Sequence, residues 1–188
     1  MLPKEITNYR NLVVLKDGSK VLLRALTPDD KEHLTKMFSQ ASNGDVRFLR
    51  DDVKDPAVIE SWCEGVDYSR VLPIVAVAQN HVVGLASLHF GSGPERHIGG
   101  IRIYLAREYR RRGLGTRIIQ SLIDLARKNG LFLLEAEVVA SQIKVIKAFQ
   151  NMGFQLCCTF DDYFMLPDGE TTDVARLIIN LKPKGDEF

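Results

Sequence analysis

The chain has 188 residues, 45% of them hydrophobic and 26% charged, which is the size and composition of one globular domain with a substantial core. Its 25 Lys and Arg against 24 Asp and Glu leave a formal net charge of +1, so overall charge favours neither nucleic acid nor an anionic membrane as a partner. The sequence has no apolar run of membrane-spanning length and no N-terminal signal core, so we expect a cytoplasmic protein. Its three cysteines fit neither a disulfide framework nor the spaced pairs of a zinc site, and we expect no metal.

The first third of the chain predicts a hairpin followed by two helices. Leu12 to Leu15 and Val21 to Leu26 are strand-like runs on either side of an Asp-Gly turn. Thr27-Pro28, with an acid three residues after the Thr, is a typical helix start, and Asp55-Pro56 opens a second, shorter helix. The polar segment 42–54 between these helices has no clear period, so we expect it to be irregular.

The rest of the chain alternates strands with two longer helices. Strands are predicted at Leu72 to Ala78, Val82 to Phe90, Ile98 to Leu105, Leu131 to Val139, Phe154 to Phe160 and Ala175 to Leu181. Helical spacing predicts a helix from Leu114 to Lys128 and another that Ser141 caps and Gly153 ends, and Pro167-Asp168-Gly169 predicts a turn. This order predicts one mixed α/β domain over 1–188, with an N-terminal extension and first hairpin strand (1–19), a core (20–181) and a tail (182–188).

The strongest chemical signal lies between the strand that ends at Leu105 and the long helix. It is the run Arg110-Arg111-Arg112-Gly113-Leu114-Gly115-Thr116. Backbone amides in the first turn of a helix lack intrahelical acceptors and lie at the positive end of the helix dipole, so they can bind a diphosphate. Glycines let phosphate oxygens approach the backbone closely, and arginines add charged donors.

Other interpretations of this run remain open at the level of the motif. It is not the P-loop pattern, because Lys-Ser/Thr does not follow Gly115, and it is not Gly-x-Gly-x-x-Gly. A Rossmann dehydrogenase is disfavoured because antiparallel hairpins precede the turn. A solvated basic patch, or a nucleic-acid contact with steeply salt-dependent affinity, could also produce three consecutive arginines.

Three ordered segments resemble the GNAT acetyltransferase superfamily. Arg110-x-x-Gly113-x-Gly115 matches the signature Arg/Gln-x-x-Gly-x-Gly/Ala between the family's fourth strand and a long helix. The segment 21–30 looks like the opening strand and helix cap, and 149–154 looks like the Gly-Phe end of the second cofactor-contacting segment. The resemblance spans about residues 20 to 181 and implies a central mixed sheet of about seven strands flanked by about four helices, with strands 4 and 5 splayed apart.

By this resemblance the protein uses acetyl-CoA as a co-substrate, and it transfers the acetyl group by direct attack of a primary amine in a ternary complex. The implied cofactor-binding residues come from strand 4, the basic turn and the segment after strand 5: Ile103, Tyr104, Leu105, Arg110, Arg111, Arg112, Gly113, Leu114, Gly115, Thr116, Gln142 and Phe149. Gln142 stands where the family often has a cofactor-contacting Asn.

The sequence departs from the family pattern at two catalytic positions. Many relatives carry a glutamate base ten residues before the signature Arg and a tyrosine acid four residues before the Gly-Phe pair, where this chain has Gly100 and Phe149, and neither can titrate. Glu137 is the base that we predict in their place, and its neighbour Glu135 shares the same strand face. Tyr104 offers a phenol as a second candidate catalytic group.

Two histidines and the acceptor loops complete the set of candidates. By the family resemblance, the acceptor loops are the first two helices and the loops after them, which set the choice of acceptor. His89 and His97 flank the loop 91–96 and could titrate near neutral pH, although such histidines are more often structural. Acids that could attract a cationic amine occur in the first two helices and the loops after them: Asp45, Asp51, Asp52, Asp55, Glu60, Glu64 and Asp67. Arg47, Arg50, Lys54 and Arg70 dilute that charge, which favours simple solvation of the loops.

These observations define two functions of different classes. The first is an acetyl-CoA-dependent N-acetyltransferase whose acceptor is a small-molecule amine or a protein lysine, with a loose resemblance to bacterial protein-lysine acetyltransferases. The second is a non-catalytic acyl-CoA-binding sensor that keeps the phosphate cradle and has lost turnover, which Gly100 and Phe149 motivate. A homodimer is left open by the sequence.

Overall fold

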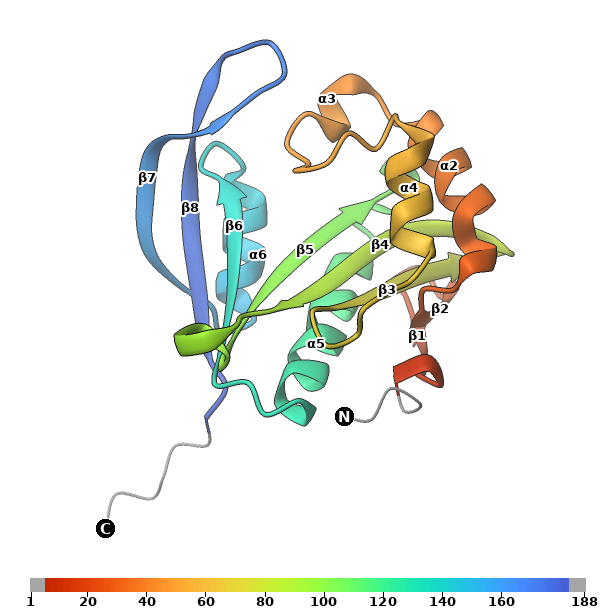
Figure 1. Cartoon of the computed structure of the whole chain (residues 1–188), viewed down its shortest axis with the longest axis horizontal. Coiled ribbons are helices and arrows are strands. Elements are labelled where there is room, and N and C mark those ends of the chain that lie inside the picture. Colours follow the sequence, from red (N-terminus) through yellow and green to blue (C-terminus); the bar gives the residue numbers. More distant parts are fainter. Residues whose placement is uncertain (1–5, 183–188) are drawn as a thin grey trace.

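Eight strands form one sheet in the order β1-β2-β3-β4-β5-β6-β8-β7 in the computed structural model, which describes residues 6–182 (Figure 1). The strands are β1 (Arg10–Val14), β2 (Lys20–Ala25), β3 (Val71–Ala78), β4 (His81–Phe90), β5 (Ile98–Leu105), β6 (Leu133–Val139), β7 (Gln155–Met165) and β8 (Thr171–Asn180). The α-helices are α2 (Lys31–Ser39), α3 (Asn43–Val46), α4 (Pro56–Cys63), α5 (Leu114–Lys128) and α6 (Ile143–Asn151). The predicted mixed α/β sheet with a short hairpin in front of it is therefore confirmed, and the hairpin strand β1 joins the same sheet.

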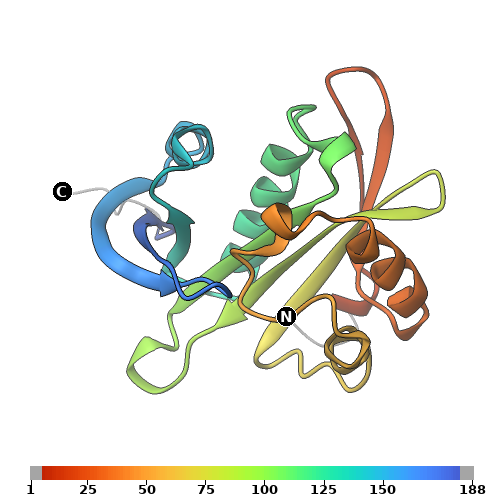
Figure 2. The same ribbon diagram turned by 90° about the horizontal axis from the view of Figure 1, so that it is seen from above.

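The sheet has a core on each face. On one face α5 buries Leu114, Ile118 and Leu122, which recur at helical spacing as the sequence predicts. On the other face Phe38 of α2 and Ile59 of α4 pack over β3 and β4 in a second cluster. Figure 2 shows the sheet edge-on between these two helical layers. Residues on alternate positions of β5 therefore reach different layers, which decides where each predicted site residue points.

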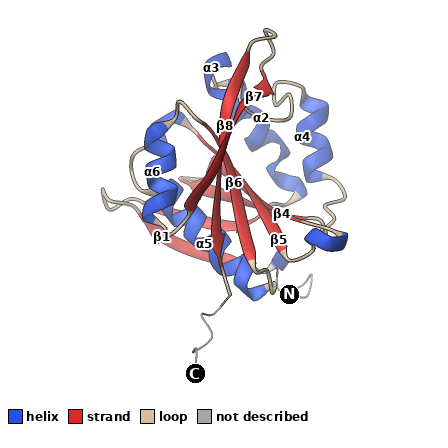
Figure 3. Cartoon of the chain, turned by 90° about the vertical axis from the view of Figure 1, so that its left-hand side faces the viewer, coloured by secondary structure: helices blue, strands red, loops and turns tan. Residues whose placement is uncertain are grey.

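The strands β5 and β6 pair over only half of their length. They are parallel, and their partnered residues run from Ile98 with Leu133 to Ile101 with Ala136. Beyond Ile101 the two strands separate, and β6, β8 and β7 form an arm that turns away from β1 to β5 (Figures 1 and 3). When the strands are counted from β2, which follows the N-terminal hairpin strand β1, β5 and β6 are the fourth and fifth strands. They are the splayed pair that the family resemblance implies.

Several boundaries differ from the sequence prediction for local reasons. Segment 42–54, predicted to be irregular, contains α3, because Ser42 caps it by accepting a hydrogen bond from the Asp45 amide at 3.2 Å. Gln142, and not Ser141, is the N-cap residue of α6. The strands β7 and β8 extend further toward their turn than predicted, since pairing continues to Met165 and Thr171.

Other details of the prediction agree with the structure. The capping box of Thr27 and Asp30 is present at the start of the first helical segment. The predicted turn at 167–169 places Gly169 at a φ of 85°. Of the predicted extension 1–19 and tail 182–188, residues 1–5 and 183–188 lie outside the described range. Between residues 6 and 182, none of the helices is both long and apolar enough to cross a membrane.

Candidate functional site

The basic turn reaches the start of α5 through two residues in the left-handed region. Gly113 is the N-cap of α5 and has a φ of 90° and a ψ of −5°. Arg111 has a φ of 61°, a conformation that is uncommon for a residue with a side chain. Strained residues of this kind are found at ligand sites more often than elsewhere, since the surrounding structure must hold them in place. The turn therefore has the local conformation of a preformed binding loop.

The amides of this turn are available to a ligand. Within residues 6–182, the backbone N–H groups from Arg111 to Thr116 donate no hydrogen bond to the protein, and the first amide of this region that does so is that of Arg117, to the Gly113 carbonyl at 3.2 Å. These free donors coincide with the positive end of a 15-residue helix. The described residues thus fit a diphosphate group such as that of coenzyme A, by the arrangement that binds phosphates at helix N-termini generally.

The three arginines of the turn have different partners. Arg110 donates through Nε to the Leu105 carbonyl at 2.9 Å and forms an ion pair with Asp45. Arg112 donates through Nε to Asp17 at 2.7 Å in the β1–β2 turn. Arg111 is exposed and forms no ion pair within the described part of the chain. The guanidinium groups of Arg110 and Arg112 thus hold the turn in position, and that of Arg111 is free to meet a phosphate; the cofactor-binding role of all three arginines stays a prediction.

A residue that the sequence pattern did not indicate also lies at the turn. A β-carbon built on Gly113 would lie 3.4 Å from Cγ of Lys16, and the Lys16 amide donates to the Arg112 carbonyl at 3.2 Å. The Lys16 side chain is exposed, so its ammonium group is available near the free amides. Nothing in the local sequence connects this hairpin residue with a turn so far along the chain, so only the packing of the hairpin on the turn could have identified it.

Tyr104 lies in the second core. It is 8% exposed, and its ring lies 4.9 Å from that of Phe38 in α2, with the Arg110 guanidinium 5.6 Å from the ring centroid. Burial raises the pKa of the phenol. This packing favours a structural role for the ring. The catalytic role of the phenol stays a prediction, and the backbone of Tyr104 remains a proposed cofactor contact beside Ile103 and Leu105.

The remaining predicted cofactor residues lie at the starts of α5 and α6 and on α6 itself. Gly115 is the second residue of α5, and a β-carbon there would make an ordinary contact at 3.5 Å with Cδ1 of Leu105, so the helix starts directly beside β5. Gln142 begins α6 and is half-buried. Phe149 is 3% exposed and packs edge-on against Phe154 at 5.0 Å. The cofactor role of each stays a prediction, and for Phe149 the burial favours packing.

Glu137 lies on the predicted face but is already paired. Glu135 and Glu137 are half-buried on the face of β6 opposite its core residues. The Glu137 carboxylate accepts from Arg176 of β8 at 2.7 Å and also from Arg50. Both oxygens of Glu137 are therefore engaged by guanidinium groups, which suits an anchoring side chain, and its predicted role as the base stays a prediction. The Arg176 Nε, in contrast, is a buried donor that has no acceptor within residues 6–182.

The acids of the acceptor loops mostly have structural partners. Asp45 pairs with Arg110, Asp51 lies 3.9 Å from Arg102, Asp55 caps α4, Glu60 pairs with Lys31, and Asp67 accepts from Ser69. The segment 42–54 also reaches the other arm of the sheet, where Arg47 pairs with Asp168 at 3.2 Å. It therefore spans the region where β5 and β6 separate (Figure 1), and its acids hold it there. This agrees with the interpretation that these acids do not form a free cationic-amine site.

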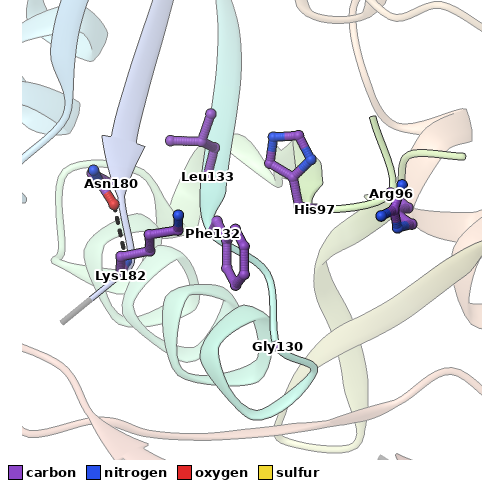
Figure 4. A pocket seen from close by; sticks show the side chains of 7 residues that line it. All are labelled: Arg96, His97, Gly130, Phe132, Leu133, Asn180 and Lys182. Carbon is purple, nitrogen blue, oxygen red and sulfur yellow. Dashed lines mark hydrogen bonds between the residues drawn. The ribbon is translucent and has the colours of Figure 1, made fainter. Parts of the chain in front are cut away.

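A hollow in the surface lies apart from this region. A cavity of 550 Å³ lies at the start of β5 and β6 and is lined by Arg96, His97, Phe132 and Lys182, among others (Figure 4). The His97 ring lies 5.8 Å from that of Phe132 there. Because β5 has eight residues, this cavity and the basic turn lie at opposite ends of a strand about 25 Å long. His97 is therefore distant from the free amides.

Comparison with known proteins identifies the family. The model described as Acetyltransferase (GNAT) family matches residues 35–154, so the chain belongs to the GNAT family of acetyltransferases. The chain is 34% identical over 62 residues to the ribosomal protein bS18 alanine N-acetyltransferase of Escherichia coli K12, a match that spans 33% of this chain and 42% of that protein. The chain thus matches less than half the length of this curated relative.

Solved structures with low sequence identity share the fold. The GNAT domain of PAT from S. lividans superposes with a TM-score of 0.77 at 20% identity, covering 96% of this chain and 99% of that one. The acetyltransferase yncA of Salmonella typhimurium, solved with its cofactor acetyl-CoA, gives 0.74 at 18% identity and covers 88% and 96%. A ribosomal-protein-alanine N-acetyltransferase from Brucella melitensis gives 0.74 at 22%, covering 84% and 98%.

Proposed function

We propose that this protein transfers an acetyl group from acetyl-CoA to a primary amine, and that the amine attacks directly in a ternary complex. The observation that carries the proposal is the set of free amides from Arg111 to Thr116 at the start of α5. They lie just after β5, which separates from β6 beyond Ile101. If these amides hold the diphosphate of acetyl-CoA, the rest of the molecule can lie along β5. Its thioester would then reach the place where β5 and β6 separate.

The residues around that separation suit an amine acceptor of some size. Segment 42–54 crosses above it, and β8 contributes Arg176, whose guanidinium lies 5.1 Å from the centroid of the Phe160 ring. The buried Arg176 Nε, which has no acceptor within residues 6–182, could donate to a carbonyl oxygen of the acceptor. Such a donor would favour an acceptor with an amide or carboxylate group near its amine.

Steady-state release of free thiol from acetyl-CoA tests the proposal. The panel of acceptors contains polyamines, free amino acids, lysine peptides and a peptide with N-terminal alanine, the last because two of the similar proteins are named for ribosomal-protein alanine. Release that depends on one of these amines, with the acetylated product identified by mass, supports the transferase. Tight acetyl-CoA binding without amine-dependent release across the panel supports the sensor instead.

The sensor remains the second candidate because one specific observation favours it. Gly100 and Phe149 occupy the positions where many family members have titratable side chains. General acid-base groups contribute about 10²- to 10⁴-fold, whereas positioning can contribute more, so their absence lowers turnover without abolishing it. A transferase with a different proton acceptor is therefore consistent with this site.

A further inference from the structure

The absence of a side chain at Gly100 leaves open space beside a histidine. A β-carbon built on Gly100 would have no heavy atom within 4 Å. His89 of β4 is the direct partner of Gly100 in the antiparallel pair, so the two residues point to the same face of the sheet. That face lies opposite the α5 core, on the side where segment 42–54 crosses the separating strands.

The imidazole of His89 is held by one hydrogen bond. Its Nε2 lies 2.8 Å from Oγ of Ser87, two residues earlier on the same face of β4. Within residues 6–182 its Nδ1 has no hydrogen-bond partner. When Nε2–H donates to Ser87, Nδ1 carries the lone pair, so the ring has one fixed nitrogen and one that is free to accept a proton.

The surroundings keep this imidazole neutral. Burial, together with the positive charges of Arg102 of β5 and Arg50 of the crossing segment, lowers the pKa of His89 to about 4, and Asp51 opposes them. Glu135 faces the same region from β6 as the parallel neighbour of Gly100. At neutral pH the ring is therefore an acceptor and not a donor of protons.

We propose that His89 Nδ1 is the proton acceptor of the transfer reaction and that Ser87 positions it, replacing the glutamate that this chain lacks at Gly100. The inference rests on the proposed function. As the acceptor nitrogen forms its bond to the acetyl carbon, the C–S bond breaks and coenzyme A leaves as its thiol. The ammonium acceptor first loses one proton to water and attacks as the neutral amine. His89 then receives the second proton as the nitrogen bonds to the acetyl carbon and passes it to the departing thiolate, so the products are amide, thiol and one proton. The low pKa of His89 favours the second half of this step, because a weakly basic imidazole readily passes its proton on to the thiolate.

The test compares three variants in the amine-dependent thiol-release assay. His89→Gln and His89→Ala are expected to lower kcat about 10²- to 10⁴-fold. Both should leave the calorimetric Kd for acetyl-CoA within about twofold of wild type, because His89 lies outside the amide turn. Added imidazole should restore part of the activity of His89→Ala, which a purely structural role would not allow. His97→Gln, at the remote cavity, is the matched control and should keep wild-type kcat.

A measurement on the unaltered protein guards against variants that fail to fold. The His89 ring protons, followed by NMR in the absence of substrate, should titrate with a midpoint near 4. Full kcat in His89→Gln, or a ring already protonated at neutral pH, overturns the inference and leaves the transferase intact. Wild-type protein that releases no thiol with any amine overturns the proposed function itself, which is a different outcome.

Discussion

Replacing Gly113 with alanine perturbs the amide turn with a single methyl group. Gly113 holds a φ of 90°, and a β-carbon there would lie 3.4 Å from Cγ of Lys16. A residue with a side chain costs about 1–2 kcal/mol in this conformation. A diphosphate requires the turn in its present form, so acetyl-CoA binding should weaken about 5- to 30-fold as the ligand restores the strained conformation. The same cost should lower the thermal midpoint of Gly113→Ala by about 2–8 °C in a chain of this length.

Gly130→Ala is the matched control for this substitution. Gly130 has a φ of 73° beyond the other end of α5, and a β-carbon there has no heavy atom within 4 Å. The backbone cost is therefore similar, whereas the amide turn is untouched. Isothermal calorimetry with acetyl-CoA and a thermal melt of both variants separate affinity from stability. An unchanged Kd in Gly113→Ala, or an equal loss of affinity in Gly130→Ala, would refute the assignment of the diphosphate to this turn.

Three further predictions concern the charged residues around the site. Arg111→Ala should weaken acetyl-CoA binding by about tenfold without lowering the thermal midpoint of unfolding. Arg112→Ala should lower that midpoint, because Arg112, unlike Arg111, is paired with Asp17 of the β1–β2 hairpin. Calorimetry measures the affinity of both variants, and thermal melts measure their stability. Asp30 is buried, which raises its pKa, but hydrogen bonds from Arg24 and the Thr27 amide outweigh this and lower it. The folded state thus binds this proton less tightly than the unfolded state, so the free energy of unfolding decreases as the pH is lowered below about 4. In urea melts at neutral pH, Asp30→Asn should lower the free energy of unfolding by about 3 kcal/mol. The variant should also show a weaker loss of stability below a pH of about 4. Glu137→Gln should raise the KM for the amine and leave the shape of the pH-rate profile intact, and a lost ionisation in that profile would restore Glu137 as the base.

The sequence predicted the elements well where one local signal dominated. Leu114, Ile118 and Leu122 fix the long helix through their period, and the Thr27 capping box fixes the start of the first helical segment. The amide turn could likewise be placed, because glycines and arginines directly before an amphipathic helix have few other arrangements.

What the sequence could not provide depends on contacts between distant segments. Arg110, Arg111 and Arg112 look equivalent in sequence, yet Asp45 and Asp17 engage the first and the third. The position of Glu137 on its strand predicts a base, but no local pattern shows that Arg50 and Arg176 contact its carboxylate.

The pairing of His89 with Gly100 is a similar case. It depends on the register of the β4–β5 pair, and no local pattern reports that register. The residues that give the site its chemistry were thus visible in the sequence, but their partners, which decide which of them remain free to act, were not.

The central claim is that the free amides at the start of α5 bind coenzyme A. An amide-resolved NMR titration of this 21.2 kDa chain with coenzyme A tests it most directly. We predict that the largest shifts occur in the N–H groups from Arg111 to Thr116, and that the amides around Phe132 in the remote cavity stay unchanged. Saturable binding that shifts the cavity amides and leaves the α5 turn unaffected would contradict the claim.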